Sequence, residues 1–292
     1  MQERVHCLPV QETPHHAEIR LNDVQRRFDR AANGFDSADF AHAHVRGGLL
    51  ERLEPMEVSP GLMLDLGSAT GSAAFELARR YRKSRVVAID ASEGMARRVS
   101  AKRRLFSKVH AVQADAKALP IPDHSAALVF SNLLLPWIED PDTVFGEVAR
   151  VLKKDAPFIF SALGPDSLKT VADAFDSAGA DPRINVFPDM HDIGDGLVRA
   201  GLRDPVLDVD RLTIDYSSAQ SLFDDLAATG ARNALAARRR TLLGRRQFET
   251  VLKRLGSAFT VELEIVYGHA WGSGQSRDDV RIDAGRIPVR RR

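Results

Sequence analysis

The order of apolar and polar residues along this chain changes near Gly61. Before that point, apolar residues recur at helical spacing between Leu21 and Leu53, with a break at Asn33-Gly34 that predicts two helices. After it, short apolar runs alternate with amphipathic stretches, which is typical of a sheet whose strands are connected by helices. Residues 1–20 are polar and are expected to form a loose lead-in.

Five apolar runs between residues 62 and 163 predict five strands. The strands are expected at 62–66, 86–89, 109–112, 126–131 and 158–163, and helices between them at 72–81, 93–104 and 140–152. Strands that alternate with helices favour a parallel sheet that is covered on both faces. The predicted fold class is therefore α/β, doubly wound and Rossmann-like.

Beyond residue 163 the alternation is less regular. Helices are expected at 166–177, 190–200 and 218–229, an Arg-rich and mostly helical stretch at 232–255, and strands at 206–216 and 259–269. We therefore predict that residues 1–55 form a lead-in with helices that cover the site. Residues 56–292 form the α/β domain, with a helical insertion at about 217–256 and a last strand at 259–269.

Composition narrows the possible functions only slightly. Lys and Arg number 41 against 40 Asp and Glu, a formal charge of +1, which excludes a uniformly basic surface for nucleic acid. No apolar run approaches the roughly 20 residues of a membrane helix, and the N-terminal residues lack the apolar stretch of a signal peptide. The single Cys7 excludes an internal disulfide and a CxxC metal or redox motif. We expect a cytoplasmic protein that uses no metal, membrane or nucleic acid.

A loop of small residues follows the first predicted strand, and a helix begins there. The loop reads Asp65-Leu-Gly67-Ser-Ala69-Thr-Gly71. Small residues let a ligand approach the backbone closely, and the free N–H groups of the helix start point at it. The competing interpretation is a tight turn that needs glycine only for its own geometry.

Polar residues also end or follow the next three strands. Asp90 ends the second strand 19 residues after Gly71, Asp115 follows the third, and Ser131-Asn132 ends the fourth. The carboxyl ends of parallel strands meet at one edge, where a ligand binds. Asp90 would accept both ribose hydroxyls, and Asp115 an adenine amino group. Each residue could instead cap a helix. A Rossmann dehydrogenase is the close competitor, but Asp65 would then face a pyrophosphate.

These motifs resemble those of the class I S-adenosylmethionine-dependent methyltransferases. The matching positions are Asp65-x-Gly67-x-Ala69-x-Gly71, Asp90, Asp115-Ala116-x-x-Leu119-Pro120 and Arg150-Val151-Leu152-Lys153. Segments along nearly the whole chain resemble one family in particular, the malonyl-acyl-carrier-protein O-methyltransferases of biotin synthesis. These segments span residues 28–36, 131–137, 164–168, 186–192, 229–233, 238–245 and 266–271.

The resemblance implies methyl transfer from S-adenosylmethionine to the free carboxylate of malonyl carried on acyl carrier protein, on the way to pimeloyl. No general base is required, because a carboxylate is already ionised at pH 7. Arg, Tyr or His side chains are expected to hold the malonyl carboxylate, and the sequence does not say which. The residues that the family would place in the site are Asp65, Gly67, Ala69 and Gly71 at the methionine moiety, Asp90 at the ribose, Asp115 and Ala116 at the adenine, Asn132 beside the methyl donor, and Phe35 and Trp137 as candidates at the reacting groups.

The stretch from 232 to 254 holds eight Lys and Arg residues and one acid, Glu249. The family's carrier protein is acidic, so a basic face would steer and orient it. The candidate docking residues are Arg238, Arg239, Arg240, Arg245 and Arg246. A solvated helix face and an RNA-binding patch are the alternatives. The RNA alternative is weakened because Phe248 is the only aromatic residue among the arginines.

The chain departs from the family pattern at three places. Ser68 and Ala69 stand where Cys and Gly are usual, Phe35 where Tyr is usual, and Lys153-Lys-Asp-Ala-Pro157 where the turn usually ends in Pro-Gly-Gly. The methyl group of Ala69 either crowds the cofactor or is tolerated by a backbone with φ below zero.

Two further hypotheses stay open. One is a methyltransferase-like complex I assembly factor, non-catalytic or of hydroxylase type. The other is a methyltransferase for another small carboxylate or amine, since substrate pockets diverge faster than the core. The sequence also leaves open whether the carrier is acyl carrier protein or coenzyme A.

Overall fold

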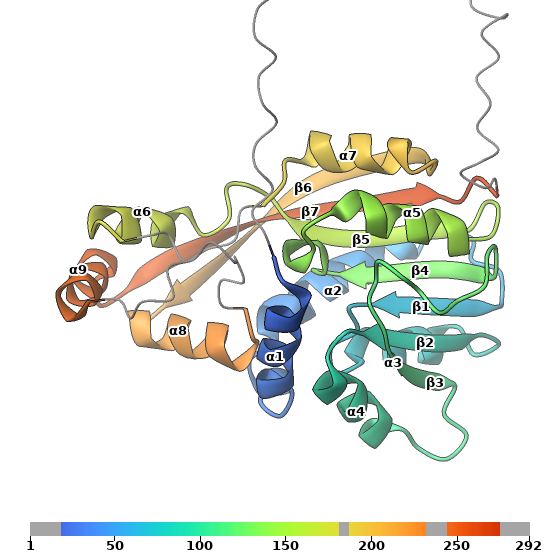
Figure 1. The fold of residues 1–292 in the computed structure, drawn as a ribbon, viewed down its shortest axis with the longest axis horizontal. Coiled ribbons are helices and arrows are strands. Elements are labelled where there is room, and N and C mark those ends of the chain that lie inside the picture. The colour runs from blue at the N-terminus through green and yellow to red at the C-terminus, as the bar shows by residue number, and fades with distance from the viewer. Residues whose placement is uncertain (1–18, 181–186, 232–243, 275–292) are drawn as a thin grey trace, which may run out of the picture.

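The structure is a computed structural model that describes residues 19–180, 187–231 and 244–274 (Figure 1). Its centre is a seven-stranded sheet in the order β3-β2-β1-β4-β5-β7-β6. The strands are β1 (Leu62–Leu66), β2 (Arg85–Asp90), β3 (Val109–Gln113), β4 (Ala126–Asn132), β5 (Pro157–Leu163), β6 (Arg203–Tyr216) and β7 (Phe259–Trp271). Each predicted strand is present, with its ends displaced by up to three residues.

The helices also follow the predicted order. They are α1 (Leu21–Ala31), α2 (Phe40–Leu53), α3 (Ser72–Arg80), α4 (Glu93–Lys102), α5 (Pro141–Val151), α6 (Lys169–Ser177), α7 (Met190–Arg199), α8 (Ala219–Ala228) and α9 (Arg245–Leu255), with short 3-10 helices η1 (Phe35–Ser37) and η2 (Leu135–Trp137). Several of the ends have a local cause. Ser92 caps α4 by accepting the Met95 N–H at 3.1 Å, and Pro141 occupies the first position of α5.

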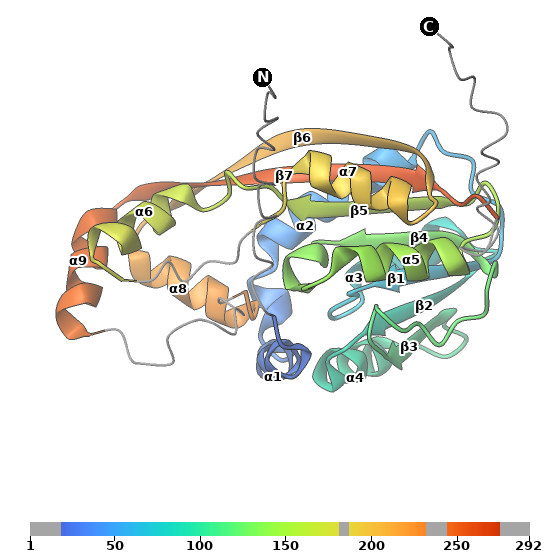
Figure 2. The same ribbon diagram turned by 45° about the horizontal axis from the view of Figure 1, so that its top comes forward.

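Helices cover both faces of the sheet, as the α/β class requires (Figure 2). On one face, buried side chains of α2, α3 and α4 form a core with Met63, Val86 and Leu128 of the strands. On the other, α5 and α7 bury Phe145 and Leu197 against the sheet. The doubly wound Rossmann-like fold is therefore confirmed.

The direction of the last two strands differs from the parallel arrangement that the alternation favoured. The strands β3, β2, β1, β4 and β5 are parallel, but β7 is antiparallel to both β5 and β6. β7 is the last of the described strands in chain order, yet in the sheet it lies between β5 and β6. The pattern of a single strand carries no information about this insertion.

The strands β6 and β7 continue beyond the rest of the sheet (Figure 1). Pairing of β7 with β5 stops at Ile265, and residues 259–264 of β7 pair with β6 alone. The helices α6, α8 and α9 gather around this extension, where Phe223 contacts both Phe175 and Phe248. These three helices and the extension of β6 and β7 together form a lobe at one end of the molecule.

A close contact fixes α2 on the sheet. A Cβ added at Gly48 would lie 2.5 Å from the Tyr267 hydroxyl oxygen, so only glycine allows this approach. One turn further along α2, the Arg52 guanidinium lies 3.7 Å from the centre of the Tyr267 ring and forms an ion pair with Asp208. These contacts, made by the second half of α2, fix the position of the helix, and its first half then lies over the strand ends.

Among the described residues, no helix has both the length and the apolar character needed to cross a membrane.

Candidate functional site

A pocket opens at the carboxyl ends of β1, β2 and β4, beneath α1 and α2. The pairing of Leu66 with both Ile89 and Ser131 aligns these three strand ends, which brings their following residues together. Of the predicted cofactor residues, all but Gly71 line the pocket, and both aromatic candidates do so as well. The lining includes Phe35, Asp65, Gly67, Ala69, Asp90, Asp115, Ala116, Asn132 and Trp137.

The loop after β1 turns sharply because three of its residues have positive φ. The φ angles are +67° at Gly67, +45° at Ala69 and +86° at Gly71. The N–H groups of Gly67 and Ser68 donate to Ile89 O at 2.9 and 3.1 Å, which ties the loop to the end of β2. Gly71 does not line the pocket; it begins α3 in the left-handed conformation and lies against Val99. Its role is the geometry of the turn.

The side chain of Asp90 holds this loop from the next strand. Its Oδ2 accepts the Ala69 N–H and its Oδ1 the Ser92 N–H, both at 2.8 Å. Burial raises the pKa of Asp90 to about 6, although these two N–H groups act in the opposite direction, and the neighbouring Asp29 raises it further. Both carboxylate oxygens retain a free lone pair for a ligand.

Asp65 lies fully buried at the end of β1. Its Oδ2 has no hydrogen-bond partner among the described residues, nor does the buried Oγ of Ser68. Burial raises the pKa of Asp65 to about 7; the Ala74 N–H lowers it, and the charge of Asp90 raises it. Buried polar atoms are normally paired. These two buried atoms therefore remain available for hydrogen bonds to a ligand in the pocket.

Asp115 and Ala116 lie beyond β3 at the other end of the pocket. The Lys117 N–H donates to Asp115 Oδ1 at 2.9 Å, which orients the carboxylate. Both ends of the Asn132 amide bond to the protein. Its Nδ2 donates to His42 O and its Oδ1 accepts from Ser161 Oγ, both at 3.0 Å. Asn132 therefore joins β4 to α2 and supports the pocket wall rather than offering a free amide.

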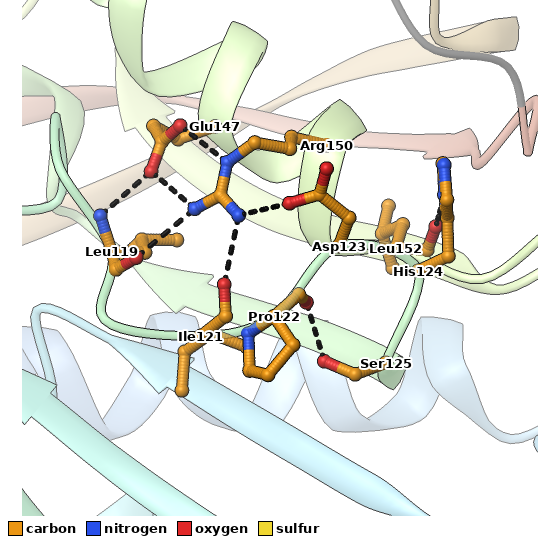
Figure 3. Close-up of polar contacts among 9 residues, drawn as sticks. All are labelled: Leu119, Ile121, Pro122, Asp123, His124, Ser125, Glu147, Arg150 and Leu152. Atoms are coloured by element: carbon orange, nitrogen blue, oxygen red, sulfur yellow. Dashed lines mark hydrogen bonds and ion pairs between the residues drawn. The ribbon is translucent and has the colours of Figure 1, made fainter.

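Arg150 of α5 fastens the turn that follows Asp115 and Ala116 (Figure 3). Its guanidinium donates to both Glu147 carboxylate oxygens at 2.7 Å, to the carbonyl oxygens of Leu119 and Ile121, and to Asp123. Glu147 also accepts the Leu119 N–H at 2.7 Å. The two sequence motifs around Leu119 and Arg150 are thus two halves of one clamp.

Aromatic side chains close the pocket opposite the strand ends. The rings of Phe28 in α1 and Trp137 in η2 meet edge to face, with 5.0 Å between their centres. Phe35 is buried and lies 5.1 Å from the His42 ring. These rings make this wall of the pocket apolar.

Two pocket residues in α2 did not emerge from the sequence. His42 and Arg46 lie one helical turn apart and both line the pocket. The Nε of Arg46 donates to Glu76 at 3.1 Å, and its NH1 lies 3.7 Å from Asp39. The four-residue spacing of His42 and Arg46 can be seen in the sequence, but two polar residues on one face of a helix usually face solvent. Their place in the pocket becomes clear only because α2 lies over the strand ends in the structure.

Known proteins resemble this chain in sequence and in fold. A methyltransferase-domain family matches residues 64–160. A malonyl-[acyl-carrier protein] O-methyltransferase of Methylovorus sp. is 40% identical over 277 residues, covering 91% of this chain and 93% of that protein. The enzyme of the same name from Halorhodospira halophila is also 40% identical, covering 92% and 96%. The chain belongs to the malonyl-[acyl-carrier protein] O-methyltransferase family.

Solved structures support the fold alone. The YcgJ protein of Bacillus subtilis has a TM-score of 0.56 at 16% identity, covering 79% of this chain and 98% of that one. The phosphoethanolamine N-methyltransferase 2 of Haemonchus contortus, solved with S-adenosyl-L-methionine, also scores 0.56 at 16% identity, covering 87% and 60%. As a member of this methyltransferase family, the chain is an S-adenosylmethionine-dependent O-methyltransferase.

The structure shows where each of the three departures from the family pattern lies. The methyl group of Ala69 would be easily tolerated at a negative φ, but the φ of Ala69 is +45°. Phe35 is buried in the pocket wall, where the family's usual hydroxyl is missing. The 153–157 turn lies at the opposite end of β5 from the pocket and has no bearing on it.

Ala69→Gly is expected to raise the free energy of unfolding by about 0.5–1 kcal/mol. Relief of the left-handed strain is worth roughly 1–2 kcal/mol, and the added chain entropy of glycine offsets part of it. Chemical denaturation measures the change. Ala73→Gly, in the helix that follows, is the control and should destabilise instead. If Ala69→Gly instead lowers the free energy of unfolding, the prediction that the backbone at residue 69 is strained is wrong.

Cofactor affinity of this methyltransferase is expected to rise with pH between about 5 and 8. The buried carboxyls Asp65 and Asp90 have pKa values of about 7 and about 6, and a ligand that donates hydrogen bonds prefers them ionised. Below these values the ligand must displace protons. Calorimetric titration of S-adenosylmethionine across this range checks the trend, and a pH-independent affinity would contradict it.

The same two groups give the opposite trend for stability without ligand. Their pKa values are raised by folding, so the folded chain binds more protons than the unfolded chain between about pH 4 and 7. The free energy of unfolding should therefore fall as pH rises through this window.

Of the five predicted docking arginines, the structure describes two, Arg245 and Arg246, and these are separated from the pocket. Arg238, Arg239 and Arg240 lie outside the described residues. Arg245 and Arg246 begin α9 and are exposed, with Arg245 Nε donating to Glu249 at 2.9 Å. Helix α9 lies in the lobe at the end of β6 and β7, away from the strand ends that form the pocket (Figure 1). Among the described residues, no group of three or more His, Cys, Asp or Glu side chains is arranged to hold a metal ion.

Proposed function

We propose that this protein methylates the free carboxylate of a malonyl group carried on an acidic acyl carrier protein, in the synthesis of biotin. The observation that carries the proposal is the pocket where Asp65, Asp90 and Asp115 converge at the strand ends, in a chain 40% identical to enzymes named for this reaction. The single Cys7 suits the reducing cytoplasm, where we place the reaction.

Each pocket residue takes a role toward the cofactor under this proposal. Asp65, with the loop from Gly67 to Ala69, would hold the methionine part, and Asp90 would accept the ribose hydroxyls. Asp115 and Ala116 would contact the adenine. The buried, unpartnered Oδ2 of Asp65 supports this fit, since the cofactor ammonium can donate to it.

The chemistry asks for position rather than acid–base catalysis. When bound, S-adenosylmethionine would supply a methyl group activated on a sulfonium, and its transfer to an ionised carboxylate requires no proton transfer from the protein. The chain's residues hold the two reactants in line, for which effective molarity lowers the barrier. Phe28, Phe35 and Trp137 keep water from the reacting oxygen.

Mass spectrometry of malonyl-carrier protein, incubated with this protein and S-adenosylmethionine, tests the proposal. The expected result is the gain of one methyl group. Malonyl-coenzyme A as substrate shows whether the carrier protein is needed. No gain, with no cofactor binding by calorimetry, would contradict methyl transfer altogether. The two other functions left open by the sequence have no observation of this structure in their favour.

The Arg-rich segment is proposed as the carrier's docking face. Replacing Arg238, Arg239 and Arg240 together by Glu should weaken binding of malonyl-carrier protein at least tenfold, because the carrier is acidic. Affinity for S-adenosylmethionine should not change. The same charge reversal at the exposed Arg82, Arg103 and Arg104, on another part of the surface, is the control. Equal loss of carrier and cofactor binding would point to misfolding and contradict a docking role.

A further inference from the structure

His42 lines the pocket beside Asn132. Its backbone oxygen accepts Asn132 Nδ2 at 3.0 Å, so it sits beside the residue that the family places next to the methyl donor. Its ring packs against Phe35, with 5.1 Å between the ring centres, and lines the pocket. The contact with Phe35 does not use a nitrogen of the imidazole for a hydrogen bond.

The imidazole of His42 is neutral at physiological pH. Burial lowers its pKa to about 4, and the positive charge of Arg46 acts in the same direction. Its Nδ1 is closed off from solvent and has no hydrogen-bond partner among the described residues. With no acceptor at Nδ1, the single ring proton is favoured on Nε2, the other ring nitrogen. The ring therefore brings one neutral donor to a pocket it lines.

The other polar groups of the pocket are engaged or suited to the cofactor. Asn132 uses both ends of its amide on the protein. Arg46 is held by Glu76 and Asp39 beside the methionine end. Three of the remaining groups are carboxylates, which would repel a second carboxylate, and Ser68 belongs to the loop after β1. Among the described lining residues, the rings of His42 and Trp137 thus carry the neutral N–H donors, and of the two His42 lies against Asn132.

A neutral donor also suits the reaction. The negative charge of the carboxylate is consumed as the ester bond forms, so any group that stabilises that charge does so more in the ground state than in the transition state. A full cation against the attacking oxygens would hold the substrate tightly and slow the transfer. A neutral N–H positions one oxygen at a smaller cost to the nucleophile.

We propose that His42 binds one carboxylate oxygen of the malonyl group through its imidazole N–H and leaves the other oxygen to attack the methyl carbon. The inference rests on the proposed function and adds the residue that recognises the acceptor. It makes His42 a substrate-binding residue with no part in proton transfer.

Three variants test the role. His42→Leu should raise KM for malonyl-carrier protein about 10- to 100-fold, the loss expected for one hydrogen bond to a charged group. His42→Gln keeps a neutral donor and should restore KM to within about fivefold of the wild type. His44→Leu, two residues along the same helix at an exposed position, is the control and should change nothing. Affinity for S-adenosylmethionine, measured by calorimetry, should stay within about twofold in all three.

A direct readout does not depend on turnover. Adding malonyl-carrier protein to the complex with S-adenosylhomocysteine should shift the ¹⁵N resonance of the His42 protonated nitrogen and leave that of His44 in place. The carrier without malonyl should produce no such shift. If the unloaded carrier also shifts the His42 resonance, His42 does not recognise the malonyl carboxylate.

The outcomes separate this inference from the function on which it rests. If the wild type does not methylate malonyl-carrier protein, the proposed function fails and the role of His42 fails with it. If the wild type does so while His42→Leu keeps its KM, only the role of His42 is overturned. Loss of cofactor affinity in both His42 variants would assign the ring to the pocket wall and would equally overturn it.

Discussion

Replacing Asp90 by alanine is expected to weaken S-adenosylmethionine binding at least 100-fold. Two charge-assisted hydrogen bonds to the ribose would be lost, each worth about 1.5–3 kcal/mol. The loop would loosen as well, because Asp90 Oδ2 and Oδ1 hold the N–H groups of Ala69 and Ser92 at 2.8 Å. Calorimetry with the purified variant measures the effect.

Asp90→Asn separates the two contributions. The amide retains one acceptor oxygen with nearly the same shape, so an intermediate loss of affinity is expected. Ser92→Ala is a further control, since it removes the cap that accepts the Met95 N–H at 3.1 Å but leaves the Asp90 carboxylate in place. Its cofactor affinity should change less than tenfold. An unchanged affinity in folded Asp90→Ala would show that the ribose assignment is wrong.

Arg150→Met is expected to have the largest effect on stability, a loss of about 3 kcal/mol. Five hydrogen bonds of the clamp disappear, two of them bidentate to Glu147, whose side chain is only 18% exposed and would be left without its cation (Figure 3). The melting temperature should fall by about 5–10 °C. Cofactor affinity should fall less than in Asp90→Ala, because the turn carries Asp115 only indirectly.

Arg199→Met is the matched control for this prediction. Arg199 also binds an aspartate in two-point fashion, Asp142 at 2.9 and 3.1 Å, but the two side chains are 57% and 42% exposed. Solvent screens such a pair, so its loss should cost less than about 1 kcal/mol. If Arg150→Met and Arg199→Met lower the free energy of unfolding equally, burial of the clamp adds nothing to its contribution to stability.

The sequence predicted the elements of the fold more fully than their arrangement. Apolar runs such as Leu62–Leu66 and Ala126–Asn132 are buried nearly throughout, so their strands stand out in the chain. Periodicity along β7 predicted a strand too, but not its neighbours. Its place between β5 and β6 depends on pairing between residues about a hundred positions apart, such as Phe158 with Ala270.

The cofactor end of the pocket could be predicted because consecutive strands deliver it. Asp65 and Asp90 lie at the ends of β1 and β2, and Asp115 follows β3 in the same parallel set, so their convergence follows from the fold class alone. His42 and Arg46 could not be found this way. They reach the pocket because Gly48 lets α2 lie directly on Tyr267, a contact between segments more than two hundred residues apart.

The place of β7 has a consequence for how the chain is made. In the sheet order, β6 has a single neighbour, β7, which is the last strand along the described chain. While the ribosome is still translating the lobe, β6 has nothing to pair with and the edge of β5 is open, although every strand around the pocket has already emerged. The nascent chain can thus assemble the half that holds the cofactor first, and it carries two unpaired edges until residues 259–271 arrive to join them.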